Sequence, residues 1–185
     1  MKENAWCWKD FLSKEDTKHL INFIEKNYDF SENEKSYKKE LKNTNKVKCI
    51  SWGKLKQNNL IKDIVERFYI INEDVFGYNL NSLKNSQVAN FTEYPSTKKG
   101  EYKWHIDASP NHLKDIKLTG IINLSDKDYE GGEFQLSVGE IIDLPDFSQG
   151  GDMILFKSNT IHRVLPVTKG TRKTLTFFIE GPRFI

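Results

Sequence analysis

The chain has 185 residues, 37% of them hydrophobic and 12% aromatic, which fits one globular domain with a real core and excludes intrinsic disorder. Its 28 basic and 26 acidic side chains leave a formal net charge of +2, too small for bulk charge to indicate a nucleic-acid or membrane partner. Charges interrupt every apolar run, no signal peptide is recognisable, and the two cysteines form neither a disulfide framework nor a metal motif, so we expect a cytoplasmic protein.

Two amphipathic helices are predicted in the first half of the chain. Residues 13–28 place apolar side chains near a 3.6-residue period, with Ser13 as N-cap and Asp16 three residues later. Residues 57–75 carry a wider apolar stripe, and Gly77 stands where a C-terminal stop belongs.

The segment between these helices, residues 31–56, holds eight lysines and three glutamates. Its composition predicts a mobile segment with one short strand near residues 47–52. Three interpretations of its charge stay open: a solvated surface, a lid over a peptide substrate, or a surface that recruits an acidic partner.

From Gln87 onward the pattern changes to period two and short apolar runs separated by turn residues, which predicts strands. The expected strands are 87–94, 102–106, 118–124, 133–136, 140–142, 152–156, 162–167 and 172–179. Eight strands without intervening helices predict a closed sandwich or barrel, and a jelly roll is the usual eight-stranded solution. We expect a single domain over residues 1–185, with a β core over 86–182 and, over 1–85, helices packed on one sheet.

A metal site is predicted from His105, Asp107 and His162. On an extended strand, His105 and Asp107 point to the same face, roughly 6.6–6.8 Å apart along the chain. This spacing alone is weak, but His162, 55 residues after Asp107, adds a second imidazole. Two histidines and a carboxylate form the facial triad that holds Fe(II) on one side and leaves other positions open.

A carboxylate-binding pair is predicted from Arg172 and Thr174. Lysines far outnumber the four arginines of this chain, so an arginine at a candidate site indicates a need for its fork geometry. Period two puts Arg172 and Thr174 on one face of the last strand, where guanidinium and hydroxyl can bind one carboxylate. A solvent-facing arginine on an edge strand is the plainer alternative.

Residues near the metal motif receive structural roles. Core packing accounts for Trp104, and Tyr102 is expected to share no face with His105. His112 lies in a loop where it either contacts substrate or is solvated, and His19 is expected on a helix surface.

These motifs resemble those of the Fe(II)/2-oxoglutarate-dependent dioxygenases, in particular the prolyl-4-hydroxylase-like branch and its small bacterial and phage members. The likeness extends from about Gln87 to Pro182, about half of the chain. Besides the metal motif it includes Tyr94-Pro95, Gly100, Tyr102, Gly131-Gly132-Glu133-Phe134 and His162-Arg163-Val164 with Pro166-Val167.

The resemblance implies a double-stranded β-helix, a mainly β jelly roll. It implies that the three predicted metal ligands bind iron and that Arg172 binds the distal carboxylate of 2-oxoglutarate. Tyr94, Thr119 and Asn123 would line the cosubstrate pocket, although some relatives have a tyrosine where Asn123 stands. The implied cofactors are Fe(II), 2-oxoglutarate and O2, with ascorbate as an optional reductant.

The implied activity is hydroxylation of an unactivated C–H bond, with a prolyl residue of a peptide or protein as the substrate. A free amino acid or another small metabolite is the alternative substrate. A non-catalytic metal-binding jelly roll is the alternative of another class, although such a module would not require the Arg172 and Thr174 pair. Nucleic-acid demethylation is disfavoured, because Phe178 stands where those relatives carry a second arginine.

Overall fold

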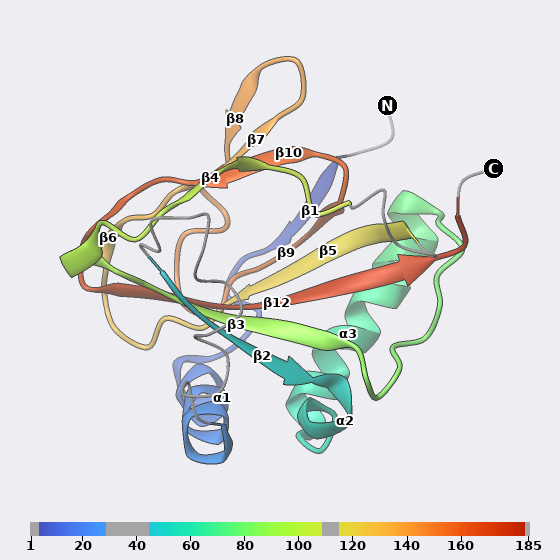
Figure 1. Cartoon of the computed structure of the whole chain (residues 1–185), viewed down its shortest axis with the longest axis horizontal. Helices are drawn as coiled ribbons and strands as arrows, with labels where there is room; N and C mark the ends of the chain where they lie inside the picture. The colour runs from blue at the N-terminus through green and yellow to red at the C-terminus, as the bar shows by residue number, and fades with distance from the viewer. Residues whose placement is uncertain (1–3, 29–44, 109–114, 184–185) are drawn as a thin grey trace.

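The computed structural model describes residues 4–28, 45–108 and 115–183. Strands dominate it, and most of them form two antiparallel sheets that face each other (Figure 1). The larger sheet has six strands, in the spatial order β1 (Ala5–Trp8), β9 (Met153–Lys157), β5 (Asp115–Asn123), β12 (Thr171–Gly181), β3 (Val88–Pro95) and β2 (Lys46–Ser51).

The smaller sheet has four strands, in the order β4 (Tyr102–His105), β10 (Ile161–Val164), β7 (Phe134–Ser137) and β8 (Ile141–Asp143). In Figure 1 it lies above the larger sheet, and the hairpin of β7 and β8 projects from the top of the molecule. Two short strands, β6 (Glu130–Gly131) and β11 (Val167–Lys169), pair separately. A 3-10 turn, η2 (Ser96–Lys98), follows β3.

The predicted period-two pattern of the last strand is confirmed in β12. Leu175, Phe177 and Ile179 are buried in the core shared with the helices. Arg172 and Thr174 are also buried, but on the opposite face, which points toward the smaller sheet. The larger sheet therefore has an apolar face for packing and a face on which polar residues lie between the sheets.

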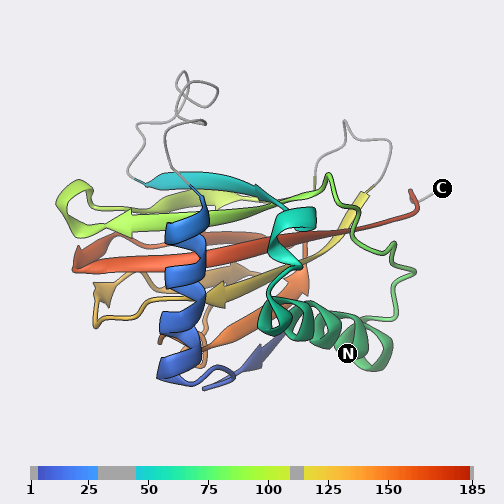
Figure 2. The same cartoon turned by 90° about the horizontal axis from the view of Figure 1, so that it is seen from below.

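The first predicted helix is confirmed as α1 (Lys14–Asn27). The side chain of Ser13 caps it by accepting a hydrogen bond of 3.0 Å from the backbone N–H of Asp16. Its buried residues are Thr17, Leu20, Ile21 and Ile24. Figure 2 shows α1, in blue, lying across the outer face of the larger sheet.

The second predicted helix, residues 57–75, is confirmed as α3 (Asn59–Ile71), which continues into a π-helical turn, η1 (Asn72–Phe76). A short helix that was not predicted, α2 (Trp52–Leu55), precedes it. The predicted stop at Gly77 is confirmed: this residue has φ 67°, a left-handed conformation that favours glycine. Like α1, these helices cover the outer face of the larger sheet (Figure 2).

Gly120 allows α3 to approach the sheet closely. A Cβ at this position would collide with the ring of Phe68, which is fully buried on α3. The absent side chain on β5 therefore makes room for the largest apolar side chain of the helix.

The structure corrects one of the predicted strands and adds others. The predicted strand 162–167 is divided into β10 and β11, because Pro166 has no N–H to continue a ladder. β1 was not predicted; it completes the edge of the larger sheet by pairing with β9, far away in sequence. The strand predicted near 47–52 is confirmed as β2.

Part of the lysine-rich segment 31–56, up to residue 44, lies outside the described residues, as does His112. No helix in the described part of the chain is both long enough and apolar enough to cross a membrane.

Candidate metal centre

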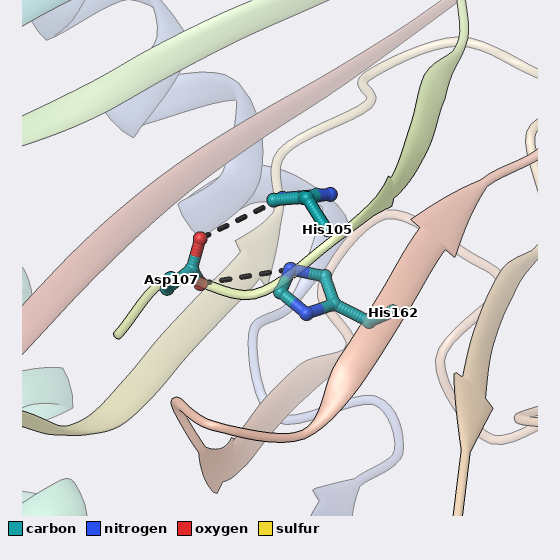
Figure 3. Close-up of side chains that lie close together, drawn as sticks. All are labelled: His105, Asp107 and His162. Carbon is teal, nitrogen blue, oxygen red and sulfur yellow. Dashed lines mark ion pairs between the residues drawn. The ribbon is translucent and has the colours of Figure 1, made fainter. Parts of the chain in front are cut away.

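Three potential ligands meet between the sheets. His105 ends β4, Asp107 lies two residues later, and His162 lies on β10 directly opposite His105 in the strand register. One ligand atom from each side chain lies within 4.8 Å of the others. The Nε2 atoms of both histidines are 3.6 Å from the carboxylate of Asp107, one from each oxygen. Figure 3 shows the two imidazoles directed toward that carboxylate.

Backbone carbonyls fix the orientation of both imidazoles. Nδ1 of His105 donates a hydrogen bond of 2.7 Å to Lys103 O, and Nδ1 of His162 donates one of 2.9 Å to Thr160 O. Because a carbonyl only accepts, each Nδ1 carries a proton, and in this tautomer of a neutral imidazole the lone pair lies on Nε2, the atom that faces the cluster. Burial lowers the pKa of His162, which favours the neutral imidazole that binds a metal; His105 acts in the same direction, and Asp107 opposes it.

The cluster is closed on one side and open on the other. The side chain of His162 is 4% exposed, whereas that of His105 is 26% exposed. Phe134 and Phe156 pack against the ring of His162, with centroid distances of 5.5 and 4.8 Å. In this arrangement the protein ligands would occupy one side of a metal ion and leave its other side accessible. Such an arrangement suits a metal that must also bind a substrate.

Thr119 lies beside the carboxylate of the cluster. Its hydroxyl donates a hydrogen bond of 2.8 Å to Oδ2 of Asp107. Thr119 is expected to contact 2-oxoglutarate, but in the structure its hydroxyl orients a candidate metal ligand. Sequence alone could not name this partner, because Thr119 lies on β5 of the larger sheet, whereas Asp107 follows β4 of the smaller one.

Arg172 lies deeper between the sheets, with 1% of its surface exposed. Its guanidinium carbon is 5.5 Å from the centre of the Tyr94 ring and 5.4 Å from that of Phe147. Neither Nε nor Nη2 has a hydrogen-bond partner among the residues that the structure describes. A buried cation with donors that lack partners is unfavourable without an anion, so the surroundings of Arg172 fit a carboxylate ligand.

Tyr94 and Thr174 lie next to this guanidinium. Tyr94 pairs with Arg172 in the strand register, and its side chain contacts the hydroxyl of Thr174. Burial raises the pKa of Tyr94 to about 12, although the charge of Arg172 acts in the opposite direction. The phenol therefore stays neutral and can donate a hydrogen bond at physiological pH.

The amide of Asn123 is engaged within the protein. Its Nδ2 donates to the hydroxyl of Tyr129 at 2.8 Å, and its Oδ1 accepts from the backbone and hydroxyl of Ser125. The Tyr129 hydroxyl in turn donates to Ser148 O. No pattern in the sequence indicates this contact, because Tyr129 lies in a loop.

Two expectations about the neighbours of His105 were wrong. Tyr102 packs on its ring, with a centroid distance of 4.0 Å, because the register between β4 and β10 shifts between His162 and Val164 and breaks the period-two alternation. Trp104 is not in the core: it is 37% exposed, and the guanidinium of Arg163 lies 4.3 Å from its ring centre.

Comparison with known proteins agrees with this geometry. The family model of the 2OG-Fe(II) oxygenase superfamily matches residues 89–180. The chain belongs to this superfamily. Among curated relatives, a PKHD-type hydroxylase of Xylella fastidiosa strain M12 is 35% identical over 96 residues, which cover 44% of this chain and 40% of the relative. The chain thus spans less than half the length of the curated relatives it matches.

Solved structures of 2OG-Fe(II) oxygenases share the fold. A viral collagen prolyl hydroxylase from Paramecium bursaria Chlorella virus-1, in complex with 2OG, has a TM-score of 0.69 at 18% identity, covering 98% of this chain and 97% of its own. A Trichoplax adhaerens prolyl hydroxylase, in complex with a hypoxia inducible factor peptide fragment, has a TM-score of 0.66 at 16% identity, covering 96% and 83%.

The residues present fit the two cofactors of the 2OG-Fe(II) oxygenases. Two imidazoles and one carboxylate are a donor set that suits Fe(II). The unpartnered nitrogens of the Arg172 guanidinium supply the charge and donors that a dicarboxylate such as 2-oxoglutarate requires.

Proposed function

We propose that this protein is an Fe(II)- and 2-oxoglutarate-dependent dioxygenase that hydroxylates a prolyl residue in a peptide or protein. The observation that carries the proposal is that two features lie between the same two sheets: the open-sided cluster of His105, Asp107 and His162, and the buried guanidinium of Arg172, whose Nε and Nη2 have no hydrogen-bond partner among the described residues. A non-catalytic metal-binding module would need the first feature but not the second.

Each element of the site has a role in this proposal. His105, Asp107 and His162 would hold Fe(II) on one face, and Thr119 would keep the carboxylate of Asp107 in its ligating orientation. Arg172, with Thr174 and the neutral phenol of Tyr94, would hold the distal carboxylate of 2-oxoglutarate. With both cofactors bound, O2 is consumed: one oxygen atom enters succinate as carbon dioxide is lost, and the other enters the substrate as hydroxyl.

The protein's own contribution is orientation and exclusion of water. Carbonyl acceptors hold both imidazoles in the ligating tautomer, so neither ring must reorganise. The aromatic residues Phe134, Phe156 and Phe147 close the apolar side of the space between the sheets. The burial of Arg172 strengthens its interaction with a carboxylate, because the local dielectric constant is low.

We further infer a double-stranded β-helix for the catalytic core. Its support is the order in which the chain visits the two sheets: β3, β5, β9 and β12 belong to the larger sheet, and β4, β7, β8 and β10 to the smaller one. Apart from the β7–β8 hairpin, successive strands of this set alternate between the sheets, as in a jelly roll. The core would then occupy residues 86–182, with residues 1–85 as helical support in a single domain.

The prolyl substrate is supported by the named relatives, including a prolyl hydroxylase whose structure holds a peptide fragment. A free amino acid or small metabolite is the alternative. Mass spectrometry separates them: the protein, supplied with Fe(II), 2-oxoglutarate and O2, is incubated with proline-containing peptides or with free amino acids. We expect one added oxygen on a prolyl residue for each succinate formed; a gain confined to free amino acids would reject the peptide substrate.

A further inference from the structure

Residues 158–160 form the turn between β9 and β10 and contact two of the three candidate ligands. The carbonyl of Ser158 accepts hydrogen bonds from the backbone N–H groups of Asp107 and Ala108, at 3.0 and 3.1 Å. The carbonyl of Thr160 accepts from Nδ1 of His162 at 2.9 Å. Asp107 and Ala108 lie beyond the last residue of β4, where no strand ladder holds them, so the Ser158 carbonyl takes the place of a ladder partner.

The turn is itself fixed to the larger sheet through Ser158, which is 1% exposed. Its backbone N–H donates to Lys117 O at 3.1 Å, and its hydroxyl donates to Ile116 O. Both acceptors lie on β5, the strand that also carries Thr119. Both parts of Asp107 are thus held in place by residues bonded to or lying on β5. Its backbone is held through Ser158, and its carboxylate through Thr119.

We propose that Ser158 is a positioning residue for the metal centre, which sets the distance between Asp107 and the imidazole of His162 without contacting the metal. This inference rests on the proposed function, since it assigns the cluster to a metal. Without the hydroxyl, the hydrogen bond to Ile116 O is lost, and of the two hydrogen bonds that Ser158 donates to β5 only the one from its backbone N–H to Lys117 O remains. Asp107 and His162 then lose their common support, and the ligand set is less well organised for binding.

The test is the affinity of the metal-free full chain for Mn²⁺ alone, measured by electron paramagnetic resonance without 2-oxoglutarate or substrate. Loss of a residue that supports a ligand weakens metal affinity by about 10- to 100-fold, and we expect this for Ser158→Ala. Ser158→Cys keeps the shape but offers only a weak S–H donor, so its affinity should lie between those of wild type and Ser158→Ala.

Asn72→Ala is the matched control. Asn72 is 5% exposed and bonds the backbone of Tyr78 through both its Oδ1 and its Nδ2, in the helical layer outside the larger sheet. This variant should lose stability but keep the Mn²⁺ affinity of wild type. Wild-type affinity in Ser158→Ala, or an equal loss in Asn72→Ala, would overturn the positioning role.

The outcomes for the inference and for the proposed function can be told apart. Tight Mn²⁺ binding by wild type and by Ser158→Ala rejects the inference alone. Absence of Mn²⁺ binding by folded wild-type protein rejects both. If Ser158→Ala does not fold, Ser158→Cys decides: unchanged affinity in a folded Ser158→Cys protein with lowered thermal stability means that the role of Ser158 is only structural.

Discussion

The hydroxyl of Thr119 donates a hydrogen bond of 2.8 Å to Oδ2 of Asp107, and this contact joins the larger sheet to a residue that follows a strand of the smaller one. The second oxygen of the same carboxylate lies 3.6 Å from Nε2 of His105. The contact with Thr119 thus restrains the rotation of the carboxylate and keeps one edge of it directed at the imidazoles.

Replacing Thr119 with valine removes this hydrogen bond at nearly constant volume. We expect the affinity for Fe(II) or Mn²⁺ to fall by about 10- to 100-fold, as when other partners of metal ligands are removed. Thr119→Ser keeps the hydroxyl and should retain most of the affinity. An isothermal titration of the three proteins gives the comparison, and equal affinities would mean that Asp107 needs no such support.

Replacing Arg172 with glutamine removes the positive charge and the paired N–H donors of the guanidinium, but keeps a polar side chain. Hydrogen bonds between charged groups are worth roughly 1.5–3 kcal/mol, so the KM for 2-oxoglutarate should rise by about 10- to 150-fold. Metal affinity should be unchanged, because Arg172 does not belong to the cluster. Steady-state succinate formation measures the first quantity, and an unchanged KM would place 2-oxoglutarate elsewhere.

Tyr94 should contribute to stability in a pH-dependent way. Its pKa in the folded protein is raised to about 12, above its usual value of 10.0, so the contribution is complete below about pH 10 and is lost as the pH rises toward 12. Alkaline unfolding monitored by circular dichroism should show a smaller decline in stability over this interval for Tyr94→Phe than for wild type. Identical declines would show that Tyr94 does not titrate with a raised pKa.

Gly120→Ala tests the packing of α3 on the sheet. The added Cβ would meet the ring of Phe68, and overpacking of this kind costs about 1–3 kcal/mol. The melting temperature should fall by roughly 2–4 °C for each kcal/mol in a chain of this size. The double variant Gly120→Ala/Phe68→Leu should lose less than the sum of the two single variants; strict additivity would mean that the two sites do not touch.

Local sequence patterns predicted the parts of this fold that depend on local physics. The N-cap at Ser13 and the stop at Gly77 were recognisable because each is set by the preferences of a single residue. The placement of Arg172 and Leu175 on opposite faces of β12 was predictable because side chains alternate between the two faces along a regular strand. These features need no knowledge of what lies across the core.

The missed features depend on contacts between distant segments. Tyr102 lies against His105 only because the ladder between β4 and β10 is irregular, which no alternation pattern within β4 reveals. β1 forms because its partner β9 offers a free edge, which only the folded sheet provides. The role of Ser158 is invisible in sequence, because its carbonyl bonds to residues about fifty positions earlier.

In the proposed function, His105, Asp107 and His162 hold iron next to a 2-oxoglutarate site that contains Arg172. The most direct measurement is anaerobic titration of the Fe(II)-loaded protein with 2-oxoglutarate, followed in the visible spectrum. We predict a charge-transfer band in the wild-type protein that disappears in His162→Ala. A folded wild-type protein without the band, or a band that persists undiminished in His162→Ala, would contradict the account.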